Sequence, residues 1–148
     1  VTPYPFTTFF TGDESLRKRP MGRVITPLSQ MGATVTSGTG ERLPLAVIGS
    51  AKVHAINYAL PVASAQVKSA ILLAALNTPG TTTVIEKEPT RDHTENMLSY
   101  LGFEVETKRH DDGEVSISLT GHQQTAFASR DIYVPGDPSS LLLQWWPR

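Results

Sequence analysis

An internal repeat constrains the fold most, because the chain of 148 residues shows the same order of predicted elements twice, about seventy residues apart. Residues 30–35 align with residues 100–105 around a shared glycine, and Gly49 aligns with Gly121. Apolar periodicity and turn residues predict a strand at 7–11, a helix at 20–31 and a hairpin at 33–48, matched by a strand at 81–85, a helix at 90–100 and a hairpin at 103–119. A strand, a proline-bearing turn and a helix follow each copy, beginning at 54 and at 131.

This order of elements, β-α-β-β-β-α, is a circular permutation of a βαβαββ unit. Such units form small sheets, each covered on one face by helices. The predicted helix at 63–76 is apolar nearly all round, which indicates a helix buried in a helical core. The expected fold class is therefore α+β, a mixed helix-and-sheet fold of repeated βαβαββ units with small sheets packed around buried helices.

Composition narrows the possible partners. A hydrophobic content of 39%, a charged content of 18% and a net charge of −1 describe an ordinary globular protein and give no reason to expect nucleic acid or a membrane as partner. The chain has no cysteine, so disulfides and thiolate metal sites are excluded, and a cytoplasmic location is expected. No apolar run reaches the ~18 residues that would span a bilayer.

Polar residues cluster at the start of the apolar helix predicted at 63–76. Backbone N–H groups at a helix start lack intrahelical partners and favour an anion. Ser64 and Gln66 add neutral donors there, and Lys68 follows them. For Ser64 alone a simple N-cap is the better interpretation, but a cap does not explain Gln66 and Lys68 in an otherwise apolar helix.

Two further helix starts carry cations. Thr90 is the expected N-cap of its helix, and Arg91 follows it at a position where a cation is unfavourable unless a negative ligand is present. Arg19 precedes a proline that holds it extended, and its planar guanidinium suits phosphate or carboxylate. His93 fits a surface or supporting role, and the spacing of its acidic neighbours does not match a helical metal motif. The residues alone thus indicate a site for a small, multiply anionic ligand, without metal.

Four motifs in order resemble those of EPSP synthases (5-enolpyruvylshikimate-3-phosphate synthases). They are G-D-x-S-L-x-x-R-P-M at 12–21, L-P-x-A-S-A-Q-V-K-S-A at 60–70, R-D-H-T-E at 91–95 and P-G-D-P-S-S at 135–140. The S-A-Q-x-K and R-x-H-x-E forms further resemble the bacterial class that tolerates glyphosate.

The resemblance implies carboxyvinyl transfer from phosphoenolpyruvate to the 5-hydroxyl of shikimate-3-phosphate, with no metal or organic cofactor, and glyphosate as a further ligand. It assigns shikimate-3-phosphate to Ser64, Ala65 and Gln66, its phosphate to Arg91, and phosphoenolpyruvate to Arg19. Lys68, Asp137 and Ser139 are expected to support the site. The family's proton-transfer residues are expected outside this chain, so no catalytic residue is assigned.

The same resemblance predicts an incomplete first domain over residues 1–148, with copies at about 7–76 and 81–140 and an aberrant tail at 141–148. Such a piece is expected to bind shikimate-3-phosphate weakly, and a complementary piece of the same enzyme is a possible partner. Two alternatives stay open. The chain could belong to a nucleotide-sugar enolpyruvyl transferase, whose catalytic Cys loop has no counterpart here, or it could be a non-catalytic anion-binding or structural domain.

Overall fold

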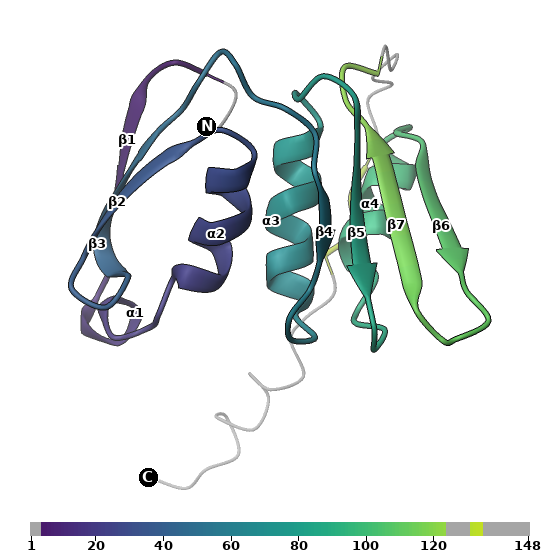
Figure 1. Ribbon diagram of the computed structural model, residues 1–148, viewed down its shortest axis with the longest axis horizontal. Coiled ribbons are helices and arrows are strands. Elements are labelled where there is room, and N and C mark those ends of the chain that lie inside the picture. The colour runs from purple at the N-terminus through teal and green to yellow at the C-terminus, as the bar shows by residue number, and fades with distance from the viewer. Residues whose placement is uncertain (1–3, 124–130, 135–148) are drawn as a thin grey trace, which may run out of the picture.

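Two small sheets enclose helices in the computed structural model, which describes residues 4–123 and 131–134 (Figure 1). The elements run β1 (Thr7–Phe10), α1 (Glu14–Arg17), α2 (Gly22–Gln30), β2 (Thr34–Gly38), β3 (Arg42–Ile48), β4 (Asn57–Ala59), α3 (Ala65–Ala75), β5 (Thr81–Glu86), α4 (His93–Tyr100), β6 (Val105–Arg109) and β7 (Val115–Thr120). Helices α2 and α3 lie side by side between the sheets. Within the described ranges, no helix is both long and apolar enough to cross a membrane.

The two sheets share one strand order. The first is β1-β3-β2 and fully antiparallel, and the second contains β5-β7-β6 in the same antiparallel pattern. Strand β4 adds to the second sheet, parallel to β5. Read along the chain, β4-α3-β5-α4-β6-β7 is one βαβαββ unit, and β1-α2-β2-β3 repeats its last four elements. The predicted fold class is confirmed.

The main core lies between α3 and the inner face of the second sheet. Ile71 and Leu72 of α3 are fully buried and pack with the inward residues of β5 and β7, among them Val84 and Ile117. Alternate burial along β7 follows from the period of two in a strand. The prediction of a helix buried in a helical core is too strong for α3, since Leu73 is 46% exposed.

Glycines end both helices that precede the hairpins. Gly32 and Gly102 have φ values of +104° and +95°, the left-handed conformation that closes a helix at low steric cost. Gly121 is required for a different reason, which is steric: a side chain there would collide with the backbone at and just after the end of α3. Its neighbour His122 donates its backbone N–H to the carbonyl of Leu76 at the end of that helix.

Some predicted elements are wrong. No helix was predicted between β1 and α2, but the structure has a helical turn there, α1, whose N-cap Asp13 accepts a hydrogen bond from the Leu16 N–H at 2.8 Å. Residues 131–134 form no strand and are exposed. A strand needs a neighbour to pair with, as β4 has in β5, and the described residues offer none there. The helix predicted from about residue 138 lies outside the described residues.

Candidate anion site at the helix starts

The segments that lead into α2, α3 and α4 lie at one end of the molecule, the lower edge in Figure 1. Strands β4 and β5 are parallel, so their carboxyl ends meet at the same edge of the second sheet. The segment before α2 carries Arg19, the segment before α3 carries Ser64, and the segment before α4 carries Arg91. The repeat thus places the candidate ligand segments on a common side.

Ser64 is the N-cap of α3, as its local pattern alone predicts. Its backbone is extended (φ −151°, ψ 103°), and its Oγ accepts a hydrogen bond from the Val67 N–H at 3.4 Å. In this bond the hydroxyl is only an acceptor, so its own hydrogen is available to a ligand. Gln66 is exposed, and the N–H groups of the first helical turn, including that of Ala65, have no intrahelical partner. The start of α3 therefore presents several donors to one small volume.

Lys68 does not reach this surface. It is 1% exposed, and its Nζ lies 2.6 Å from Glu95 Oε1 and 3.1 Å from Glu86 Oε2. The sequence places Lys68 next to the donors at the helix start, but these two buried carboxylates draw its ammonium inward.

Glu86 and Glu95 were not among the residues predicted for the site. Two sequence signals for their burial exist. Glu86 continues the inward alternation of Thr82 and Val84 along β5, and Glu95 shares the buried face of α4 with Leu98. Acidic residues at such inward positions require a buried partner.

Thr90 is not the N-cap of α4. The helix begins at His93, and Asp92 occupies the N-cap position without a side-chain bond. Thr90 instead donates its hydroxyl to Glu86 Oε1 at 2.5 Å and its N–H to Glu86 Oε2 at 3.5 Å. A buried carboxylate needs several donors, and this need overrides the local capping preference.

The two candidate arginines are both exposed. Neither the Arg19 nor the Arg91 guanidinium makes an ion pair or hydrogen bond with another residue in the described part of the chain. Two unpaired guanidinium groups at the same end of the molecule provide positive charge for an anionic ligand. His93 is also exposed.

The candidate residues do not line one pocket. Arg19 borders a hollow of about 670 Å³ with Asp13, Glu14, Ser15, Lys18 and Pro20. A second hollow, of about 300 Å³, lies between α4 and β6 and is bordered by Lys68, Thr90 and Glu95. A third, of about 300 Å³, follows residues 60–63 and 86–88. None of these hollows is shared by Arg19, Gln66 and Arg91, and Asp137 and Ser139 lie outside the described residues.

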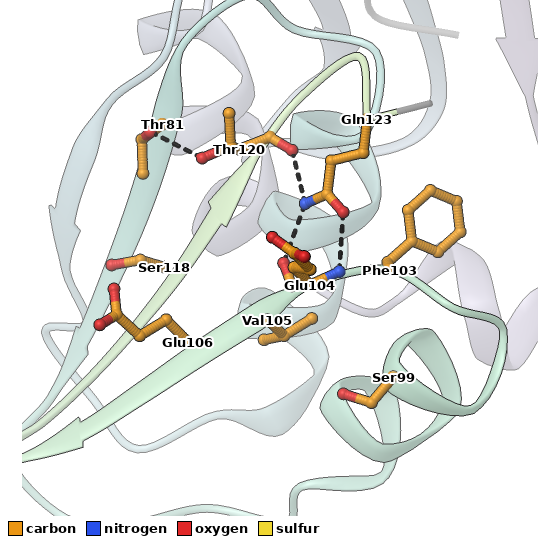
Figure 2. A pocket seen from close by; sticks show the side chains of 9 residues that line it. All are labelled: Thr81, Ser99, Phe103, Glu104, Val105, Glu106, Ser118, Thr120 and Gln123. Carbon is orange, nitrogen blue, oxygen red and sulfur yellow. Dashed lines mark hydrogen bonds between the residues drawn. The ribbon is translucent and has the colours of Figure 1, made fainter. Parts of the chain in front are cut away.

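A hollow of about 790 Å³ lies at the opposite end of the second sheet, where β6 starts and β7 ends (Figure 2). The Gln123 side chain accepts from the Glu104 N–H at 2.7 Å and donates to the Glu104 and Thr120 carbonyls, both at 2.9 Å. The carboxylates of Glu104 and Glu106 also line it. The Gln123 carboxamide thus bonds within the protein, and the negative charge of the two carboxylates repels anions. This hollow is therefore a poor anion site, and the helix starts remain the candidate.

In the described residues, no three His, Asp or Glu side chains are grouped to hold a metal ion.

Known proteins share extensive similarity with this chain. The family model described as EPSP synthase (3-phosphoshikimate 1-carboxyvinyltransferase) matches residues 2–142. Among relatives with the name 3-phosphoshikimate 1-carboxyvinyltransferase, that of Paramagnetospirillum magneticum is 57% identical and that of Novosphingobium aromaticivorans 56%, each over 140 residues. Each alignment covers 95% of this chain but 31% of the relative, so the chain spans about a third of their length.

Solved structures give the same result. An EPSP synthase from Acinetobacter baumannii superposes with a TM-score of 0.74 and 46% sequence identity, over 82% of this chain and 26% of that one. Sequence motifs, repeat topology and three-dimensional similarity therefore agree, and the chain belongs to the EPSP synthase family.

Proposed function

We propose that this chain supplies part of the shikimate-3-phosphate site of a 3-phosphoshikimate 1-carboxyvinyltransferase, within the first domain of that enzyme. The observation that carries the proposal is the family match across 2–142, which includes all three helix starts with the donors and cations described above. The relatives' name denotes transfer of a carboxyvinyl group to 3-phosphoshikimate, and the site chemistry suits such a ligand. The two repeats, at about 7–76 and 81–140, belong to this domain in our proposal.

The start of α3 binds the neutral part and the phosphate edge of the ligand. The Ser64 hydroxyl, the Ala65 N–H and the Gln66 carboxamide can each donate a hydrogen bond, and together they recognise hydroxyl and phosphate oxygens. Arg91 contacts the phosphate, since its planar guanidinium makes charge-assisted, bidentate bonds to such a group. Lys68 supports the site from the interior rather than by contact.

Arg19 binds the carboxylate or phosphate of phosphoenolpyruvate in this proposal. Two multiply charged anions repel each other, so bringing them together requires cations placed in advance. The transfer then proceeds through a tetrahedral intermediate without metal or organic cofactor. We assign no proton-transfer role to this chain, and Asp137 and Ser139 remain proposed supporting residues.

The finer assignments follow from the motif forms. We place the chain in the glyphosate-tolerant bacterial class on its S-A-Q-V-K and R-D-H-T-E segments, with glyphosate as a ligand beside Arg19. A complementary piece of the same enzyme is the proposed partner, because domain closure around substrates completes such sites. A cytoplasmic location stays a prediction.

The test is a titration of the 148-residue chain with shikimate-3-phosphate, followed by amide chemical shifts. We expect perturbations centred on residues 64–68 and on Arg91, and much weaker effects from shikimate, which lacks the phosphate. Shifts scattered over other surfaces, or none at millimolar ligand, would contradict the proposal.

A matched pair of variants tests the phosphate contact. Arg91→Ala removes a charge-assisted contact and should weaken binding by about 1.5–3 kcal/mol, which is roughly 10- to 150-fold. Arg42→Ala removes another exposed cation, from β3, and should leave affinity within about twofold. Equal affinities for the two variants would take Arg91 out of the site.

A further inference from the structure

A buried ionic cluster connects the two segments that carry the proposed ligand residues. Lys68 lies one helical turn after the N-cap Ser64, and its Nζ is 2.6 Å from the carboxylate of Glu95, in the first turn of the helix that follows Arg91. Glu86, at the end of β5, is the second carboxylate, 3.1 Å from the same Nζ. These three side chains, here named the positioning cluster, are 1%, 2% and 8% exposed for Lys68, Glu86 and Glu95.

Hydrogen bonds beside the positioning cluster strengthen this connection. Ser69 of α3 and Thr94 of α4 share a hydrogen bond of 2.5 Å between their hydroxyl groups. Glu86 also accepts a hydrogen bond from the hydroxyl of Thr90, the residue directly before Arg91. The starts of α3 and α4 are thus joined to each other and to the end of β5.

The other repeat allows a comparison at the Glu95 position. The alignment of residues 30–35 with 100–105 sets Ile25 of α2 against Glu95 of α4. The hollow beside α2, about 280 Å³, is bordered by apolar side chains such as Val24, Leu28 and Val47. The first unit therefore has an apolar residue where α4 has Glu95, and among its described elements it has no counterpart of α3, the helix that carries Lys68.

Burial of charges is costly, and apolar replacements of similar volume are often as stable or more so. Because buried ion pairs are weak evidence for stability, the positioning cluster calls for a role other than stability. Ion pairs at short distance fix direction as well as separation, which a hydrophobic contact does not. Lys68 itself cannot touch a ligand at 1% exposure.

We propose that Lys68, Glu86 and Glu95 are positioning residues, which hold the donors at the start of α3 and the Arg91 guanidinium at the separation that shikimate-3-phosphate requires. The inference rests on the proposed function and deepens it. It also explains why the lysine of S-A-Q-V-K and the last residue of R-D-H-T-E occur in one chain: they are ion-pair partners.

The first experiment compares two lysines that each form an ion pair. Lys68→Met removes the buried ammonium, and Lys18→Met removes an exposed one that is 2.7 Å from Glu14. Affinity for shikimate-3-phosphate is measured on the 148-residue chain by amide shifts, and stability by urea unfolding. We expect Lys68→Met to weaken binding at least tenfold and Lys18→Met to change it less than twofold. Wild-type affinity in a folded Lys68→Met protein would overturn the inference.

A second variant separates positioning from stability. In Lys68→Met/Glu86→Gln/Glu95→Leu the charges are replaced together, so no buried carboxylate is left without a partner and stability should return toward that of the wild type. Binding should stay at least tenfold weaker, because the α3 and α4 starts are no longer fixed. Recovery of affinity together with stability would show that the cluster only stabilises the fold, and would overturn the inference.

A ligand-free measurement keeps this inference distinct from the proposed function. Relaxation dispersion of the amides of Ala65, Gln66 and Arg91 should show exchange in the triple variant and none in the wild type. Absence of new exchange would count against the positioning role. Failure of the wild-type chain to bind shikimate-3-phosphate, with the exchange present, would refute the proposed function alone.

Discussion

Gly121→Ala should destabilise the protein more than other glycine substitutions in the chain. An added Cβ would lie 2.5 Å from the carbonyl oxygen of Ala75, the last residue of α3, and would overlap that of Thr78 in the turn that follows the helix. Carbon–oxygen contacts require about 3.3 Å, so the hairpin end must move by about 0.8 Å or more. The atoms in its way are backbone, which cannot rotate aside.

Two hydrogen bonds depend on this close approach. The Gly121 N–H donates to the Gly80 carbonyl at 3.0 Å, and the His122 N–H donates to the Leu76 carbonyl at 2.9 Å. Overpacking costs about 1–3 kcal/mol, and the two bonds contribute about 0.5–1.5 kcal/mol each. The expected loss is therefore about 2–6 kcal/mol of unfolding free energy, a large share of the total of about 5–15 kcal/mol for a domain.

The assay is urea unfolding followed by circular dichroism, with two glycine controls. Gly38→Ala introduces a Cβ no closer than 3.4 Å to any neighbour and should change stability by less than about 1 kcal/mol. Gly113→Ala has open space but a φ of +88°, so it isolates the backbone cost of about 1–2 kcal/mol. A Gly121→Ala protein no less stable than the Gly38→Ala protein would refute the steric argument.

Two further substitutions test the core and the carboxylate network. Leu98→Ala opens a cavity at a side chain that is 1% exposed and should cost about 2–5 kcal/mol of unfolding free energy. Its control Leu73→Ala, at 46% exposure, should cost about 1 kcal/mol or less. Similar losses for the two variants in urea titrations would contradict the assigned core. Thr90→Val removes the hydroxyl that donates to Glu86 and should lower the free energy of unfolding by about 1–3 kcal/mol. Thr90→Ser retains that donor and should stay near the wild type. Equal stabilities of the two variants would exclude the hydrogen bond as a contributor.

Much of the architecture is predictable because each unit signals its elements locally. Alternating apolar residues predict β7, and the helical spacing before Gly32 and Gly102 predicts α2 and α4 to within a few residues. The helical turn α1 was missed, since a four-residue helix has too few positions to show a period. The strand predicted at 131–134 failed for the reason that pairing, rather than composition, makes a strand.

The site divides in the same way. Ser64, Gln66 and Arg91 stand out in the sequence because helix starts have characteristic residues and unpaired N–H groups. Thr90 was wrongly predicted to be an N-cap. Its partner Glu86 is close in sequence, but the Glu86 carboxylate needs hydrogen-bond donors only because it is buried in the folded protein. A local pattern carries no information about that burial.

The sequence alone determined the repeat, the family and the identity of the residues at the three helix starts, because each of these depends on residue types at fixed spacings. Only the tertiary structure decided where Lys68 points. A lysine near a ligand motif looks like a ligand contact, yet α3, β5 and α4 meet so that two buried carboxylates surround its ammonium. An unpaired buried charge is costly, so the ammonium turns toward Glu86 and Glu95, which lie 18 and 27 residues further along the chain. The sequence around Lys68 contains no sign of these partners.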